Sequence, residues 1–557
     1  MCNVFVKIAS ALILVLAIIF NFFGNLFGVG DIIPTAPKTT ETTLTETSTY
    51  PEESTTEPTT EESTTEESTT ETTTNPPVTA PKPTKPTTAP DTTGTTSENT
   101  TKPGTTVEFG PKVEKADIEG FADFGGMNTD TFTAAQAVAK GGFVVSGVSA
   151  STDGDFKDVA SDWSGNSYGY VAMFDSEANP VWIKATGSSN AGVRIEDVAV
   201  LSDGSVVAVG YTTAEEFAAN TENKGSIESF IVKYSADGTM QWQKAFGGKK
   251  TDMFMSVAPL GNGFVVGGKT DSTDGSFAGN GASSVSSALL IRFDKDANVI
   301  WSRYLAGNYG ASVDGIDTDA NENIFFTTIT AASTGDFELD GMGKGYLDTA
   351  VFKYNGDGER QWGVAVASSG RDNFKAVAAD GDGGCVVAGN YELVTTYLPD
   401  GTFANLHNCG GIDAVVIRFN ANGTTRWMRS VAGFADDFIN DIAKTADGGF
   451  AVAGYSTSSN RDFATVGNKG QNDAFAALIT PAGNLADVKA LGGARRDSVT
   501  NVVYTTNGKL IVLGQTTSGD GDFDGMNTHL TDSFINVFGD AYTGFIAKYG
   551  VTISSVI

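Results

Sequence analysis

Residues 241–268, QWQKAFGGKKTDMFMSVAPLGNGFVVGG, contain the unit that the rest of the chain repeats. Trp242 is followed by a short apolar run that ends in Gly247 and Gly248, and Asp252 comes four residues after the second glycine. Two more apolar runs with a glycine turn between them complete the stretch. Other tryptophans recur in this register, at steps of 60, 59, 61 and 65 residues, at Trp182, Trp301, Trp362 and Trp427. A period of this length predicts a repeat architecture.

Two further copies keep the frame without the tryptophan. Gly120 takes its place in the first copy and Asp487 in the last, so the chain has seven starts. Each copy shows four short apolar or alternating runs that are separated by Gly, Asn and Asp, which is typical of β-strands. In the third copy we expect strands a to d at Met253–Pro259, Phe264–Gly268, Ala288–Phe293 and Trp301–Leu305.

The sequence therefore predicts an all-β fold, a seven-bladed β-propeller of four-stranded antiparallel blades over residues 107–557. A superhelical solenoid is the alternative, but its end repeats need polar caps, and no such unit is visible. The first copy begins with an isolated d-like strand at Glu119–Gly126, and the last ends with a c strand at Gly544–Gly550. We expect this N-terminal outer strand to complete the last blade and close the ring. The tail after Gly550 is interpreted as an extra edge strand or a frayed end.

The repeats resemble the SBBP-like repeats of bacterial secreted and cell-surface β-propeller proteins. The resemblance covers about residues 120–549 and implies the fold, with no common reaction attached. The motifs that carry it are W-x-K-x-x-G-G-x-x-x-D at Trp242, Lys244, Gly247, Gly248 and Asp252, D-G-G-F-x-V-A-G at Asp447–Gly454, S-x-D-G-D-F at Ser151–Phe156, and D-A-F at Asp473–Phe475.

The residues before the repeats have two further compositions. Residues 1–34 include Ile8–Gly30, which has no ionisable side chain and is long enough to cross a bilayer, so we expect a transmembrane signal-anchor or a secretory signal peptide. Residues 35–106 form a low-complexity Thr/Glu/Pro-rich linker that we expect to be disordered. Both predict an extracellular propeller, secreted or anchored to the cell membrane, and we expect a monomer.

Charge and cysteine content exclude some classes of partner and bond. The formal net charge of −31 argues against nucleic acid, which is bound by clusters of Lys and Arg. Cys385 begins one expected strand and Cys409 precedes the next, so they should lie too far apart for a disulfide. Cys2 has no assigned role.

Acidic residues recur in the long d-to-a and b-to-c loops, which emerge on the same face of a propeller, here called the loop face. We interpret them as turn residues that accept backbone N–H bonds. The alternative is a calcium loop, because carboxylates at alternate positions before a glycine can converge on a hard cation. No cofactor is certain, and the candidate calcium ligands are Asp520, Asp522, Asp524 and Asp532.

The repeated tryptophans are expected to pack between neighbouring blades. Candidate ligand-binding residues are therefore taken from elsewhere in the long loops, and they are Trp163, His529, Phe534, Phe538 and Tyr542. No catalytic residue is assigned, because the chain has two histidines and neither G-x-S-x-G nor H-E-x-x-H.

These features favour a surface-tethered module for binding or adhesion. Its ligand would be a glycan, which implies carbohydrate binding, a cell-wall polymer or a surface protein. Two alternatives stay open. One is a carbohydrate-active hydrolase or lyase that uses loop-face carboxylates, and the other is a structural surface protein that binds nothing.

Overall fold

The computed structural model describes residues 112–160, 167–187, 192–214, 217, 225–278, 285–392, 401–403, 406, 411–524 and 543–554, and for 112–123 and 543–554 the backbone alone. All of them belong to the compact unit Thr101–Ile557. Within these residues no helix is long and apolar enough to cross a membrane. The expected anchor at residues 1–34 and the linker at 35–106 lie outside the described ranges.

Six blades are each formed by four consecutive antiparallel strands, named a to d from the centre outwards. Blade 1 comprises β2 (Asp130–Ala137), β3 (Phe143–Ser149), β4 (Tyr168–Phe174) and β5 (Pro180–Thr186). Blade 2 comprises β6 (Val193–Val200), β7 (Val206–Thr212), β8 (Glu228–Tyr234) and β9 (Met240–Phe246). Blade 3 comprises β10 (Asp252–Leu260), β11 (Gly263–Thr270), β12 (Ser287–Phe293) and β13 (Val299–Leu305), close to the strands expected from the sequence.

The next three blades follow the same order. Blade 4 comprises β14 (Ala311–Thr318), β15 (Ile324–Thr330), β16 (Asp348–Tyr354) and β17 (Arg360–Val366). Blade 5 comprises β18 (Asp372–Ala379), β19 (Cys385–Glu392), β20 (Ile412–Phe419) and β21 (Thr425–Val431). Blade 6 comprises β22 (Asp437–Lys444), β23 (Phe450–Ser456), β24 (Asp473–Ile479) and β25 (Leu485–Leu491).

The prediction of seven blades is corrected to six complete blades and one composite sheet. This closing sheet has the order β1-β28-β27-β26, with β26 (Asp497–Tyr504), β27 (Leu510–Thr516), β28 (Thr543–Ser554) and β1 (Lys112–Phe124). Its construction differs because β26, β27 and β28 supply its a, b and c strands, while β1, from the start of the described residues, supplies its outer strand. β1 pairs antiparallel with β28 from Lys112 opposite Ser554 to Phe124 opposite Gly544. The expected tail is part of β28 as far as Ser554.

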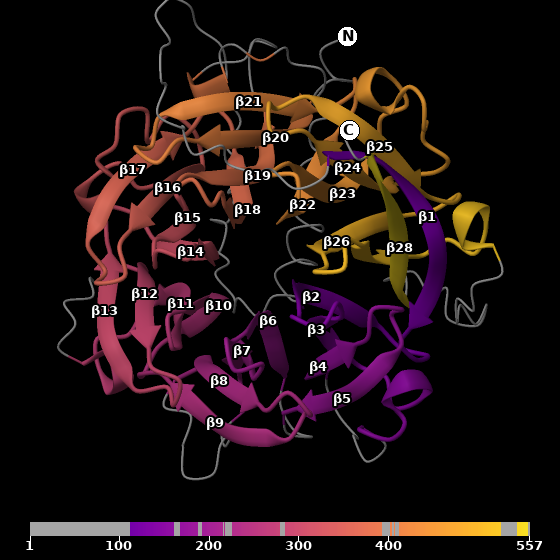
Figure 1. The fold of residues 1–557 in the computed structure, drawn as a ribbon. Helices are drawn as coiled ribbons and strands as arrows, with labels where there is room; N and C mark the ends of the chain where they lie inside the picture. The colour runs from indigo at the N-terminus through magenta and orange to yellow at the C-terminus, as the bar shows by residue number, and fades with distance from the viewer. Residues whose placement is uncertain are drawn as a thin grey trace, which may run out of the picture. The chain divides into compact units, whose positions relative to one another are not determined.

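The sheets are arranged in a ring around a central channel (Figure 1). The a strands β2, β6, β10, β14, β18, β22 and β26 line the channel, and each contacts the next, with β26 beside β2 again. The apolar core lies between neighbouring sheets. Phe124 of β1, for example, is 3% exposed and packs against Phe132, Phe156 and Tyr170 of blade 1.

The repeated tryptophans pack between blades, as predicted. Trp301 of blade 3 donates its indole N–H to the Gly356 carbonyl of the next blade, blade 4, at 2.9 Å. Its ring lies against Gly358, whose φ is +74° and whose added Cβ would meet the ring at 3.0 Å. Trp182, Trp362 and Trp427 make the same contact with the c-to-d turn of the next blade.

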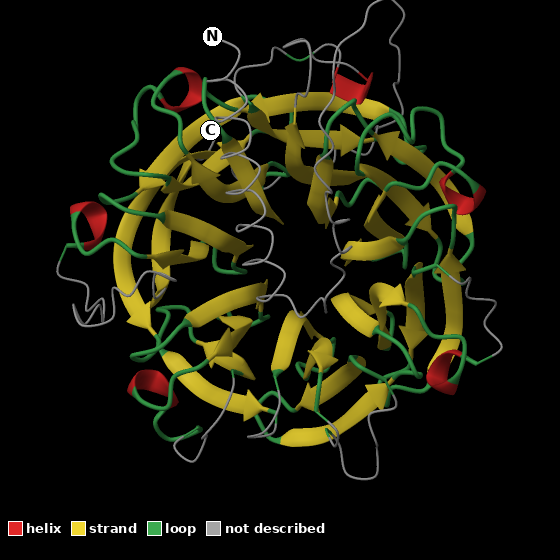
Figure 2. Ribbon diagram, turned by 180° about the vertical axis from the view of Figure 1, so that it is seen from behind, coloured by secondary structure: helices red, strands yellow, loops and turns green. Residues whose placement is uncertain are grey.

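Short 3-10 turns in the b-to-c loops lie at the periphery of the ring (Figure 2). The described turns are Gly154–Phe156, Gly275–Phe277, Gly335–Phe337, Gly401–Phe403, Arg461–Phe463 and Gly521–Phe523. Each ends in a buried phenylalanine that fills the core at a blade edge. Cys385 at the start of β19 is a buried free thiol, and Cys409 lies outside the described residues.

Candidate functional site

The first set of repeated loop-face acids fixes turns. Asp252 accepts hydrogen bonds from the backbone N–H of Gly248 at 2.8 Å and from the hydroxyls of Thr270 and Ser272 at 2.5 and 2.8 Å. Burial raises the pKa of Asp252, and these hydrogen bonds oppose the rise. The same three kinds of bond are made by Asp130, Asp437 and Asp497. Asp372 accepts from the N–H and hydroxyl of Ser368.

The second set joins four of the described 3-10 turns to the preceding d-to-a loop. The carboxylates of Asp155, Asp336 and Asp522 accept the backbone N–H of Gly125, Ala306 and Gly492 at 2.8 to 2.9 Å, and Asp462 accepts that of Ala432 at 3.2 Å. The interpretation of the repeated acids as turn residues is thus confirmed at these positions. These carboxylates were also candidates for the catalytic acids of a hydrolase or lyase, but here they accept backbone N–H bonds that hold the loops together.

Most of the residues proposed from the sequence as ligand-binding lie outside the described residues: Trp163, His529, Phe534, Phe538 and Tyr542, together with the candidate metal ligand Asp532. Asp520 accepts the Ala494 N–H at 2.8 Å, and Asp522 pairs with Lys469 at 2.5 Å, while Asp524 is exposed. The described residues bring no three acidic, histidine or cysteine side chains together in a metal-binding cluster. A calcium site that includes Asp532 stays a prediction.

An exposed apolar patch on the loop face was not expected from the sequence. It consists of Tyr309, Tyr346 and Leu347, which are 57%, 68% and 41% exposed and are named the blade-4 patch here. Tyr309 comes just before β14, and Tyr346 and Leu347 come just before β16. Ala311, the first residue of β14, and Asp348, the first residue of β16, both pair with Thr330 of β15. The starts of β14 and β16 therefore lie two strand spacings apart, about 10 Å.

Among the described positions equivalent to Tyr346, blade 4 has the only aromatic residue, while blade 3 has Val285, which is 36% exposed. The residues that correspond to Tyr346 and Leu347 are Ser226 and Ile227 in blade 2 and Gln471 and Asn472 in blade 6. Repeat alignment could have found the patch, since a tyrosine that replaces a polar residue at one copy of a solvent-exposed loop has no role in the shared fold.

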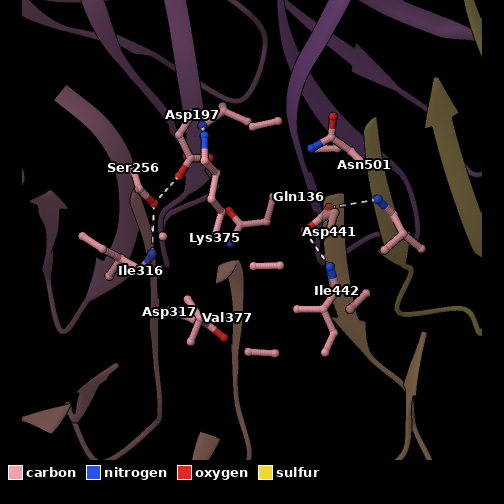
Figure 3. A pocket seen from close by; sticks show the side chains of 18 of the residues that line it. Gln136, Asp197, Ser256, Ile316, Asp317, Lys375, Val377, Asp441, Ile442 and Asn501 are labelled. Atoms are coloured by element: carbon pink, nitrogen blue, oxygen red, sulfur yellow. Dashed lines mark hydrogen bonds between the residues drawn. The ribbon is translucent and has the colours of Figure 1, made fainter. Parts of the chain in front are cut away.

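The second candidate site is the central channel, which has a cavity of about 440 Å³ (Figure 3). Every a strand carries a register irregularity in its middle, which turns polar side chains towards the channel. Asp197 and Asp441 lie on different sides of the cavity in blades 2 and 6. Glu196, Asp314, Asp317, Lys375 and Lys444 also line it.

The channel side chains connect neighbouring sheets. Asp197 accepts the Val257 N–H of blade 3 at 2.8 Å, and Asp441 accepts the Val502 N–H of the closing sheet at 2.9 Å. Gln136, Ser256 and Asp317 accept the N–H of Val200, Ile316 and Ala379 in the next blade in the same way. Blades 5 and 6 are joined by Asn390 of the b strand β19, which accepts the Ile439 N–H, and Asn501 of the closing sheet instead donates its side-chain N–H to the Thr133 carbonyl of blade 1. These channel residues therefore hold the blades in register.

Burial makes two of these carboxylates weak acids. Desolvation raises the pKa of Asp197 to about 6 and that of Asp441 to about 7, and hydrogen bonds from backbone N–H groups oppose both shifts. The charge of Asp197 contributes to the raised pKa of Asp441. Blade docking thus accounts for the positions of Asp197 and Asp441 in the channel.

Comparison with known proteins does not show a family for this chain. No protein-family model matches the chain. It is 25% identical over 227 residues to the regulatory protein FlaEY of Caulobacter vibrioides, covering 40% of this chain and 23% of that protein. It is 21% identical over 402 residues to the uncharacterized WD repeat-containing protein L264 of Acanthamoeba polyphaga mimivirus, covering 59% of this chain and 29% of that protein.

The chain thus spans less than a third of the length of these two relatives. Among solved structures it is similar to the WD40 β-propeller domain of Doa1, with 11% identity, a TM-score of 0.39, and coverage of 79% of this chain and 97% of that one. The class that the topology defines is a β-propeller. The finer resemblance to SBBP-like repeats stays a resemblance.

Proposed function

We propose that this propeller is an extracellular binding module that holds a protein partner against its loop face. The blade-4 patch carries the proposal. Two tyrosines and a leucine are exposed at neighbouring strand ends of one blade, and groups of exposed apolar side chains mark interaction sites. Tyrosine is also enriched among the residues that dominate binding energy at protein interfaces.

The framework beneath the patch is suited to binding. The loops that carry it are joined to their neighbours, because the Tyr346 N–H donates to the Gly370 carbonyl at 3.0 Å and the Ala311 N–H to the Ser286 carbonyl at 3.2 Å. Loops that are already fixed lose little conformational freedom on binding. The apolar run Ile8–Gly30 and the acidic Thr/Glu/Pro-rich segment support a location outside the cell, tethered or secreted.

The test compares the full chain with two double variants immobilised on a resin and exposed to the envelope proteins of the source organism. One variant, Tyr309→Ser/Tyr346→Ser, removes the aromatic part of the patch. The control, Val181→Ser/Met240→Ser, changes two residues of similar exposure, 61% and 53%, at the starts of β5 and β9 beside the opposite face. We expect a protein that the wild type and the control retain and that the patch variant retains at least tenfold less.

Equal retention by all three proteins would contradict the proposal. The same three proteins are applied to a glycan array. Glycan binding that disappears with the patch variant would replace the protein partner by a carbohydrate, which is the ligand class that the sequence equally allows.

A further inference from the structure

Blade 6 departs from the other blades at one backbone position of the loop face. The first residue of the 3-10 turn has a left-handed φ of +58° to +67° at Gly154, Gly275, Gly335 and Gly521. In blade 6 this residue is Arg461, with a φ of +51°. Only glycine adopts this conformation without steric cost.

The substitution also removes a hydrogen bond. In blade 1, Asp155 donates its backbone N–H to the Gly125 carbonyl at 3.0 Å, and blades 3, 4 and 5 and the closing sheet have the same bond. A Cβ at Gly154 would lie 2.1 Å from that carbonyl oxygen. Within the part of the chain that the structure describes, Asp462 of blade 6 makes no such bond to Ala432. Arg461 is therefore unfavourable for the turn itself.

The Arg461 side chain lies on an exposed aromatic ring. Its guanidinium carbon is 4.6 Å from the ring centroid of Phe434, which is 61% exposed. The Phe434 N–H donates to the Asn460 side chain at 2.8 Å, so the two loops are fixed to each other. Stacking on a ring orients a guanidinium and leaves its N–H edge available.

The local charges leave Arg461 without an internal counter-ion among the described residues. The adjacent Asp462 pairs with Arg429 at 2.9 Å and also accepts the Ala432 N–H. Asp436 is directed to the Ile412 N–H at 3.1 Å. An oriented cation on an exposed apolar ring is complementary to a carboxylate next to an apolar side chain, because carboxylates accept two parallel bonds from guanidinium.

We propose that Arg461 and Phe434 form a recognition site for an acidic side chain, Asp or Glu, that is flanked by apolar residues in a protein partner. The site rests on the proposed function, since it lies on the same loop face, and it names the chemistry of the partner there. Glycine at this position would favour the turn but would not supply the cation.

Saturation-transfer NMR with the full chain and two seven-residue peptides tests the site. The probes are acetyl-Gly-Ala-Leu-Glu-Leu-Ala-Gly-amide and the same peptide with Gln in place of Glu. We expect the wild type to bind the Glu peptide at least fivefold more tightly than the Gln peptide. In Arg461→Gly this preference should disappear, while the melting temperature stays equal or rises because glycine restores the turn of the other blades.

Arg426→Gln is the matched control. It removes one positive charge from an exposed arginine that pairs with Asp382 near the opposite face, and it should leave the preference unchanged. Equal binding of both peptides by the wild type, absence of binding, or an unchanged preference in Arg461→Gly would each overturn the site. If partner retention depends on Tyr309 and Tyr346 but not on Arg461, the proposed function stands and this site falls.

Discussion

At the scale of single residues, similar side chains serve different ends according to their surroundings. Asp252 and Asp441 both lie on the innermost strand of a blade. Asp252 fixes a loop, whereas Asp441 joins two neighbouring sheets at the channel wall. The turn role could be predicted from recurrence, because the acid returns at the same place in most copies. The docking role could not, because blades use Gln, Asp, Ser or Asn for it at different positions of the strand.

Asp441→Asn tests the docking role. The pKa of Asp441 is raised from 3.8 to about 7 in the folded protein. The raised pKa therefore contributes to the free energy of unfolding fully below about pH 4, where Asp441 is protonated. This contribution is lost as the pH rises through about 7 and the buried carboxyl group ionises. Asparagine keeps an oxygen acceptor for the Val502 N–H without a buried charge. We expect the free energy of unfolding at pH 8 to rise by about 1–3 kcal/mol.

Urea denaturation at pH 4, 6 and 8 measures this difference, which should vanish at pH 4. Asp436→Asn, the same change at an exposed neighbour, is the control. A variant less stable than the wild type at pH 8 would show that the charge of Asp441 contributes to docking.

At the scale of elements, the c-to-d turn and the tryptophan of the preceding blade form one packing unit. Sequence periodicity predicts this contact, but it misses the exception. Trp242 faces a turn with Ala297, which has a φ of +56°, where the other turns that face a tryptophan have glycine. The Trp242 indole N–H is buried without a hydrogen-bond partner among the described residues, although Lys244 lies 5.5 Å from its ring centroid.

Opposite substitutions at two equivalent turns check this unit. Ala297→Gly removes the steric cost of a left-handed alanine and should stabilise the fold by about 0.5–1 kcal/mol. Gly358→Ala introduces that cost and places a methyl group 3.0 Å from the Trp301 ring, so it should destabilise by about 1–3 kcal/mol. Both are measured by urea unfolding followed by tryptophan fluorescence. Changes of the same sign at the two turns would contradict the packing unit.

At the scale of the whole molecule, the ring depends on the closing sheet. The isolated first strand and the missing last strand predict the β1–β28 pairing from the sequence. The blade count needed correction, because the count of seven repeat starts includes the closing sheet, whose four strands are not consecutive in the chain. The blade-4 patch and Arg461 were missed for another reason: they are departures from the repeat, whereas the period reveals only what copies share.

Removal of residues 1–127 tests closure. A chain that begins at Asn128 lacks β1, so it exposes the edge of β28 and loses Phe124 from the core of blade 1. We expect a lower melting temperature, a less cooperative transition and more aggregation than in a chain that begins at Val107. Calorimetry and light scattering measure both effects, and identical melts of the two chains would contradict the closure.

The pairing of β1 with β28 also has a mechanical consequence. Lys112 lies opposite Ser554, so the chain enters the ring at the point where β28 ends. Tension applied to the chain ahead of Lys112 reaches β1 before any of blades 1 to 6. The pairing of β1 with β28 is therefore the first part of the fold to carry the force. Under sufficient force, β1 would separate from β28 while blades 1 to 6 are still folded.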